Sequence, residues 1–176
     1  SKSLNIGFVR LGPLGAPMAG PLINAGHQLF VYTRSKTPAS IAATSAIQCV
    51  NARGVAERAD ITFIMVPDTP DVESVLFAEN GIAPGLSKGK TVVDMSSISP
   101  IATKNFAQKI NALGCDYLDA PVSGGEAGAR NATLSIMVGG SEAAFERVRP
   151  LFERMGKNIT LVGGNGDGQT AKVANQ

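Results

Sequence analysis

The chain contains no tryptophan, one histidine and two cysteines, and it has no long apolar segment. Its uninterrupted apolar runs, such as residues 63–66, have the length of a strand and are too short to span a bilayer. The cysteines lie far apart, at Cys49 and Cys115, so we expect buried thiols of a reducing compartment and no metal site. Residues 1–22 lack the continuous apolar core of a signal peptide. These absences predict a cytoplasmic protein that does not bind membranes.

The charges are few and nearly balanced, with a formal net charge of +2 over 176 residues. This balance predicts no nucleic-acid partner, because binding to a polyanion requires a concentrated basic surface. The length suits one domain with a sizeable core.

Short apolar runs alternate with helical patterns along the chain. We predict strands at residues 5–9, 28–33, 47–50, 61–66, 91–95, 116–118, 134–138 and 158–162. We predict a helix through Met18 that ends at Gly26, a helix from Thr170 onward, and helices at 37–44, 52–59, 71–77, 101–113 and 142–155, the last capped by Ser141. The alternation indicates βαβ units, and hence an α/β, Rossmann-like, doubly wound and mostly parallel sheet. Ligands of such sheets bind at the carboxyl ends of the strands.

The loop after the first strand contains part of a dinucleotide-binding fingerprint. Residues 10–15 read Arg-Leu-Gly-Pro-Leu-Gly, where the fingerprint is G-x-G-x-x-G. Gly12 and Gly15 fit the second and third glycines, but Arg10 stands in place of the first. A plain strand–helix turn is the alternative. We predict that the cofactor is bound by the residues of this loop, namely Leu11, Gly12, Pro13, Leu14 and Gly15.

The loop after the second strand predicts which dinucleotide is bound. It reads Thr33-Arg34-Ser35 and has no acid to bind the two ribose hydroxyls of NAD. Arg34 can pair with a 2′-phosphate, and Ser35 can donate a hydrogen bond to it. We therefore expect a preference for NADP(H), with NAD(H) possible. The alternative is that Arg34 is a surface arginine without a ligand.

Several separated motifs, in the right order, resemble one family, the β-hydroxyacid dehydrogenases (3-hydroxyisobutyrate dehydrogenase-like). They lie at residues 66–68, 94–97, 119–125, 128–129, 133–140 and 163–176, so the resemblance covers essentially the whole chain. It implies an oxidoreductase that acts on a small carboxylated aldehyde or hydroxyacid. Residues 63–70 and 163–176 are most similar to members that reduce tartronate semialdehyde (2-hydroxy-3-oxopropionate) to glycerate. The motifs do not separate this substrate from 3-hydroxyisobutyrate, glyoxylate or succinic semialdehyde, and an inactive cofactor-binding fragment is a further alternative.

The resemblance also implies roles for individual residues. Lys172 would be the general acid, and Asn175, one helical turn later, would orient the substrate or the lysine. The substrate carboxylate would be held by Ser123 with the backbone of Gly124 and Gly125. The remaining cofactor contacts would come from Val66, Pro67, Asp68 and Ser97. From the residues alone, Lys172 could also be a surface lysine on a frayed helix, and residues 123–125 an ordinary turn. The only histidine, His27, is expected at the surface, outside the chemistry.

The sequence departs from the family at two positions where glycine is expected, Arg10 and Ala132. We expect these replacements to reduce cofactor affinity or local stability, because a side chain is unfavourable where φ is positive. We assign residues 1–164 to an NAD(P)-binding domain and residues 165–176 to the start of an interdomain helix. Family members continue into an all-helical domain that supplies much of a homo-oligomer interface, and this domain is missing from the chain.

Overall fold

A computed structural model describes residues 3–10, 12 and 14–175 of the chain. Within these residues, one sheet contains nine strands in the order β3-β2-β1-β4-β5-β6-β8-β7, with β9 beside β8. The strands are β1 (Asn5–Val9), β2 (Gln28–Tyr32), β3 (Ile47–Gln48), β4 (Ile61–Ile64), β5 (Thr91–Asp94), β6 (Asp116–Asp119), β7 (Val122–Ser123), β8 (Leu134–Gly139) and β9 (Gly156–Gly163).

The sheet is mostly parallel, as predicted. Strands β3, β2, β1, β4, β5 and β6 pair in parallel, whereas β8 is antiparallel to both β6 and β7. The chain order reverses between β1 and β4, and such a switch point opens a crevice at the carboxyl ends of the strands. The predicted cofactor loops follow these ends.

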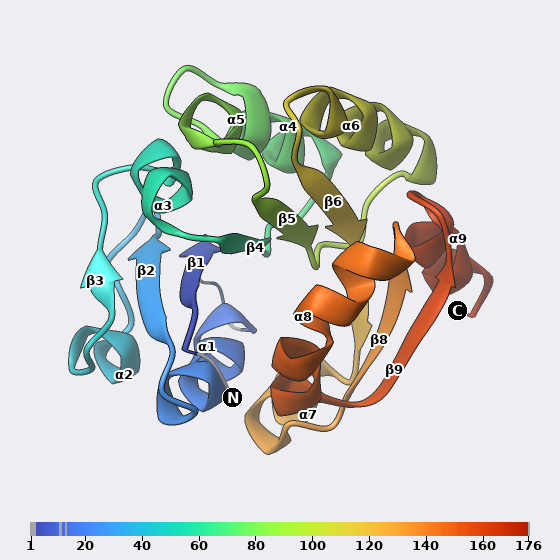
Figure 1. Ribbon diagram of the computed structural model, residues 1–176. Coiled ribbons are helices and arrows are strands. Elements are labelled where there is room, and N and C mark those ends of the chain that lie inside the picture. Colours follow the sequence, from blue (N-terminus) through green and yellow to red (C-terminus); the bar gives the residue numbers. More distant parts are fainter. Residues whose placement is uncertain (1–2, 11, 13, 176) are drawn as a thin grey trace.

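Helices cover both faces of the sheet (Figure 1). Helices α1, α7 and α8 lie on one face, and α3, α4, α5 and α6 lie on the other. The helices of the described residues are α1 (Gly15–Asn24), α2 (Ala39–Ala42), α3 (Ala52–Arg58), α4 (Thr69–Phe77), α5 (Ile82–Gly85), α6 (Pro100–Ala112), α7 (Gly125–Asn131), α8 (Glu142–Met155) and α9 (Asp167–Ala174). None of them is both long and apolar enough to cross a membrane.

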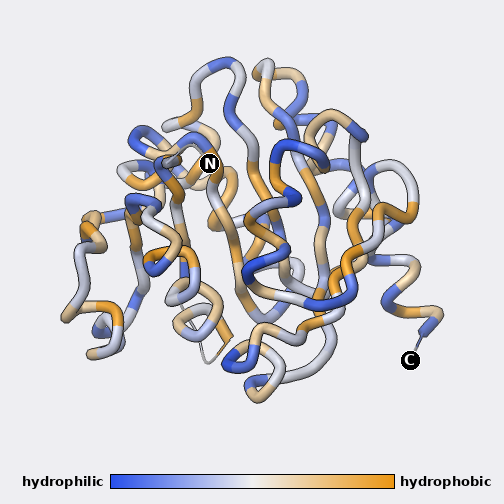
Figure 2. The backbone as a smooth tube through the Cα atoms, turned by 60° about the horizontal axis from the view of Figure 1, so that its bottom comes forward, coloured by the Kyte–Doolittle hydropathy of each residue, from blue (hydrophilic) through white to orange (hydrophobic). Residues whose placement is uncertain are grey.

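Each face of the sheet has its own apolar core. Met18 and Leu22 of α1 pack with Phe152 of α8 on one side, and Leu76 of α4 packs with Ile110 of α6 on the other. Each fully buried Leu or Phe side chain contributes about 1.5–3 kcal/mol relative to an exposed one. Figure 2 shows the apolar stretches following the central strands, as expected for strands covered on both faces.

Side-chain caps fix the starts of four helices. Ser141 accepts a hydrogen bond from the Ala144 N–H at 3.2 Å, which confirms the predicted cap of α8. Helices α3, α4 and α6 are capped in the same way, because a side chain at each start accepts a backbone N–H hydrogen bond. These caps are Asn51, Asp68 and Ser99. These polar residues set the helix boundaries locally, which explains why the sequence located these helices well.

Three short elements were not predicted: α5, β7 and α7. Strand β7 has two residues and exists through pairing with β8, where Val122 faces Ile136 and Ser123 faces Ser135. Helix α7 reads Gly-Glu-Ala-Gly-Ala-Arg-Asn, which has no large apolar residue to set a helical period. The predicted turn at residues 123–125 is therefore the end of a strand followed by a helix. Helix α2 and strand β3 are also shorter than predicted.

Candidate functional site

Helix α9 places Lys172 against the strand that carries Ser123. The Lys172 ammonium donates a hydrogen bond to the carbonyl oxygen of Val122, a residue 50 positions away in the sequence. Burial lowers the pKa of Lys172, because a partly desolvated ammonium loses hydration energy. A lysine in such a position releases its proton more easily than one in water. The geometry thus brings the predicted acid beside the predicted carboxylate site.

The other predicted substrate contacts lie at the end of α9 and at the end of β7. Asn175 follows α9 as its C-cap, is exposed, and donates its backbone N–H to the Ala171 carbonyl at 3.1 Å. Ser123 is exposed at the end of β7. Gly124 and Gly125 have φ values of 127° and 63°, which glycine adopts without steric cost. Gly125 begins α7, so the first backbone N–H groups of this helix have no intrahelical acceptor.

A buried carboxylate anchors the beginning of α9. Asp119 is fully buried at the end of β6, where its two oxygens accept hydrogen bonds from the Gly166 N–H at 2.9 Å and the Gln169 N–H at 3.1 Å. Burial raises the pKa of Asp119, and the backbone hydrogen bonds oppose that rise. These N–H groups lie at the start of α9 and have no acceptor within the helix. Asp119 therefore caps the N-terminus of α9, although it is far away in the sequence.

Gln169 fixes the same helix to the loop after β5. Its amide nitrogen donates to the Ser96 carbonyl at 2.7 Å, and its amide oxygen accepts from the Ile98 N–H at 3.1 Å. The exposed Ser97 lies between these two contacts. Neither Gln169 nor Asp119 was predicted as a site residue, because nothing in the local sequence pattern indicates that they are buried partners.

The loop after β4 is held to the same network. The Ser96 hydroxyl accepts a hydrogen bond from the Val66 N–H at 2.9 Å. Val66 is buried, whereas Pro67 and Asp68 are exposed. Asp68 caps α4 by accepting from the Asp71 N–H at 3.2 Å. Hydrogen bonds therefore join the loops after β4 and β5 and the end of β6 to one another and to α9.

The first loop turns directly into α1. The Gly15 N–H donates to the Gly12 carbonyl at 3.1 Å, and Leu14 is the N-cap residue. Helix N-termini of this kind bind pyrophosphate through free backbone N–H groups. Two residues predicted to bind the cofactor, Leu11 and Pro13, lie outside the described residues.

The loop after β2 borders two different cavities. Arg34 lines a cavity of about 660 Å³ together with Arg10, Tyr32 and Asn51. Ser35 instead lines a cavity of about 760 Å³ together with Gly12. Thr33 is partly buried.

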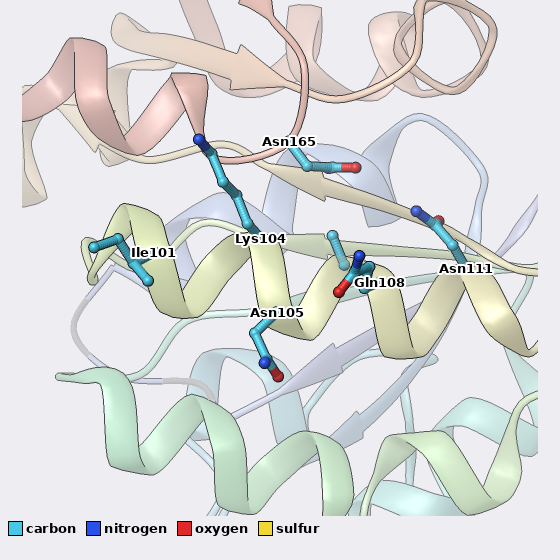
Figure 3. A pocket seen from close by; sticks show the side chains of 7 residues that line it. Ile101, Lys104, Asn105, Gln108, Asn111 and Asn165 are labelled. Atoms are coloured by element: carbon cyan, nitrogen blue, oxygen red, sulfur yellow. The ribbon is translucent and has the colours of Figure 1, made fainter.

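A third cavity, of about 450 Å³, contains none of the predicted site residues. It lies along α6, where its lining residues include Ile101, Lys104, Asn105, Gln108, Asn111 and Asn165 (Figure 3). Among the described residues that line it, Lys104 is the only charged one, so they do not pair an acid with a base. We assign no chemistry to it.

The histidine and the cysteines have structural positions. His27 is partly buried rather than at the surface, and its Nδ1 accepts a hydrogen bond from the Leu4 N–H at 3.1 Å. Burial and the charge of Arg154 lower the pKa of His27. Cys115 is buried as predicted, but Cys49 is only partly buried.

Arg10 and Ala132 stand where the family resemblance led us to expect glycine, and both have a positive φ, at 68° and 55°. A left-handed conformation costs a non-glycine residue roughly 1–2 kcal/mol. We expect Ala132→Gly to raise the free energy of unfolding by about 1 kcal/mol and Tm by about 2–4 °C, after allowing for the greater entropy of glycine in the unfolded chain. Thermal unfolding followed by circular dichroism measures this gain.

The matched control is Ala127→Gly, which changes an exposed residue inside the same helix. Glycine at position 127 is expected to lower the free energy of unfolding by about 0.5–1 kcal/mol. If both variants lost stability, the strain assigned to Ala132 would be wrong.

Comparison with known proteins identifies the domain. Residues 5–164 match the NAD-binding domain of 6-phosphogluconate dehydrogenase. The chain is 64% identical over 173 residues to the 2-hydroxy-3-oxopropionate reductase of Escherichia coli (strain K12), which covers 98% of the chain and 59% of that enzyme. It is 42% identical to the mitochondrial 3-hydroxyisobutyrate dehydrogenase of Drosophila melanogaster, over 97% of the chain and 52% of that protein.

A solved structure shows the same fold. The Mycobacterium tuberculosis 3-hydroxyisobutyrate dehydrogenase with L-serine matches with a TM-score of 0.90 and 33% identity, over 99% of this chain and 59% of that one. The chain thus spans less than two thirds of the length of these relatives. It is an NAD(P)-binding, Rossmann-like domain, and it belongs to the β-hydroxyacid dehydrogenase family.

Proposed function

We propose that this chain is the cofactor-binding part of an NADPH-dependent reductase that converts tartronate semialdehyde to glycerate. The observation that carries the proposal is the contact of the Lys172 ammonium with the Val122 carbonyl, next to Ser123. The substrate is taken from the E. coli relative, which is named 2-hydroxy-3-oxopropionate reductase.

The residues present fit a dinucleotide. The Gly12–Gly15 turn leads into a helix N-terminus, and the loop after β2 has an arginine and no acid. When bound, NADPH supplies the hydride that adds to the aldehyde carbon. Lys172 would give a proton to the aldehyde oxygen, so that the alcohol forms and a neutral amine remains.

The same site would orient the substrate. The carboxylate would be held by the Ser123 hydroxyl and by the backbone N–H groups of Gly124 and Gly125. Asn175 lies three residues after Lys172, so the two side chains share one helical face, and Asn175 would orient the substrate or the lysine. Asp119 and Gln169 hold the helix that carries both residues.

We also propose that residues 165–176 begin an interdomain helix, with residues 1–164 as the cofactor domain. The all-helical domain that follows in the family would close the cleft and supply a homo-oligomer interface. The isolated 176-residue chain would then bind cofactor weakly and turn over little.

The proposal predicts a clear cofactor preference. We expect NADPH to bind the chain at least about tenfold more tightly than NADH, because a guanidinium–phosphate pair contributes more than a hydrogen bond to a hydroxyl. Arg34→Ala should remove most of this preference by weakening NADPH binding alone. Fluorescence titration with both cofactors measures it, and Arg149→Ala, an exposed arginine of α8 paired with Glu146, is the control. Tighter binding of NADH by the parent chain would reject the role of Arg34.

A further inference from the structure

Two arginine side chains without carboxylate partners border one cavity. Arg10 and Arg34 both line the cavity of about 660 Å³ at the carboxyl ends of β1 and β2. In the part of the chain that the structure describes, the ion pairs within 4.0 Å use other arginines, namely Arg53, Arg130, Arg147 and Arg149. Both guanidinium groups are thus available to a ligand.

The backbone explains why the two side chains share this cavity. The Arg10 N–H donates a hydrogen bond to the Tyr32 carbonyl at 2.6 Å. This bond ties the residue after β1 to the end of β2, two residues before Arg34, so the two arginines leave neighbouring strands at the same edge. Arg10 holds a φ of 68° there. Strained non-glycine residues concentrate at ligand sites, where a side chain is needed despite its cost.

The cavity also contains acidic groups, which restrict the ligand. Asp71 and Glu79 line it as well, and among the described residues neither carboxylate pairs with Arg10 or Arg34. These carboxylates repel an anion. A dianionic group is therefore held well only where more than one cation opposes them.

We infer that Arg10 is a second ligand for the 2′-phosphate of NADP(H), and that it sets the cofactor specificity together with Arg34. This replaces the expectation from the sequence that an arginine at position 10 reduces cofactor affinity. This inference rests on the proposed function and extends it. A phosphate monoester carries nearly two negative charges and three terminal oxygens. One guanidinium engages two oxygens in a bidentate pair, which leaves the third oxygen and part of the charge for a second guanidinium. The uncharged 2′-hydroxyl of NAD(H) gains little from Arg10.

The test measures the dissociation constants of NADPH and NADH with the 176-residue chain and its Arg10→Gly variant. Adenosine 2′,5′-bisphosphate and adenosine 5′-monophosphate serve as probes that lack the nicotinamide half. Glycine is compatible with the backbone at position 10, so the variant should fold. We expect NADPH and the bisphosphate to bind about tenfold more weakly, and NADH and the monophosphate to bind as before or slightly more tightly.

Ala132→Gly is the matched control, because it removes left-handed strain without touching the cavity. This variant should leave the ratio of the dissociation constants of NADPH and NADH unchanged. Equal changes for NADPH and NADH in Arg10→Gly, or tighter NADPH binding, would overturn the inference while the proposed function stood. Failure of the parent chain to bind either dinucleotide would instead overturn both.

Discussion

Replacing Lys172 by methionine is expected to lower the rate of tartronate semialdehyde reduction by about two to four orders of magnitude. Methionine keeps the length and the apolar stem of the side chain but has no proton to give. The affinity for NADPH should not change, since the lysine contacts the Val122 carbonyl rather than the cofactor loops. Loss of NADPH absorbance at 340 nm measures the rate.

The assay needs a basal rate that the 176-residue chain is not expected to supply. A chimera that joins this chain to the remaining part of the E. coli reductase restores the length of that enzyme, and the 64% identity of the matched part makes the junction compatible. The same chimera, offered 3-hydroxyisobutyrate, glyoxylate and succinic semialdehyde, tests the choice of substrate. Because burial lowers the pKa of Lys172, the rate should fall as pH rises through that pKa. A methionine variant that kept the parent rate would exclude Lys172 as the acid.

Replacing Asp94 by asparagine is expected to change the pH dependence of the free energy of unfolding, by about 2–3 kcal/mol between pH 5 and pH 8. Asp94 is fully buried at the end of β5, and burial raises its pKa to about 7. Its carboxylate accepts hydrogen bonds from the Ser96 N–H at 2.9 Å and the Tyr117 hydroxyl at 3.2 Å, which oppose the rise, and the charge of Asp119 adds to it.

The sign of the effect follows from proton binding. Between about pH 4 and pH 7 the folded state holds a proton on Asp94 that the unfolded state has released, so this group destabilises the fold as pH rises. From pH 5 to pH 8 the loss amounts to about 2–3 kcal/mol. Asparagine has no proton to lose. Between pH 5 and pH 8, the free energy of unfolding of Asp94→Asn should therefore rise by about 2–3 kcal/mol relative to that of the parent.

Urea unfolding at pH 5 and pH 8 measures this shift. Glu153→Gln, the same chemical change at an exposed position of α8, is the control and should show almost no shift. A pH-independent difference between Asp94→Asn and the parent would mean that Asp94 is already ionised in the folded protein at pH 5.

The local pattern of the sequence predicted the elements that carry their own signals. Residues 61–64 form a strand because four buried residues follow one another, and α8 begins where Ser141 caps it. The positive φ of Ala132 was predicted through the family resemblance, which led us to expect glycine there. Strand β7 and helix α7 had no such signal, since β7 depends on pairing with β8 and α7 on packing against α1 and β8.

The sequence by itself determined the alternation of strands and helices and the resemblance to the family, because both depend on short-range periodicity and on motifs of a few residues. Through that resemblance it also predicted which residues would supply an acid and a carboxylate site, and these roles stay predictions. Only the tertiary structure decided that Lys172 meets the strand of Ser123, that Gln169 joins α9 to a loop more than 70 positions away, and that Arg10 and Arg34 border one cavity. Such contacts arise where parallel strands end at a common edge, and the order of strands in a sheet is set by packing rather than by spacing along the chain.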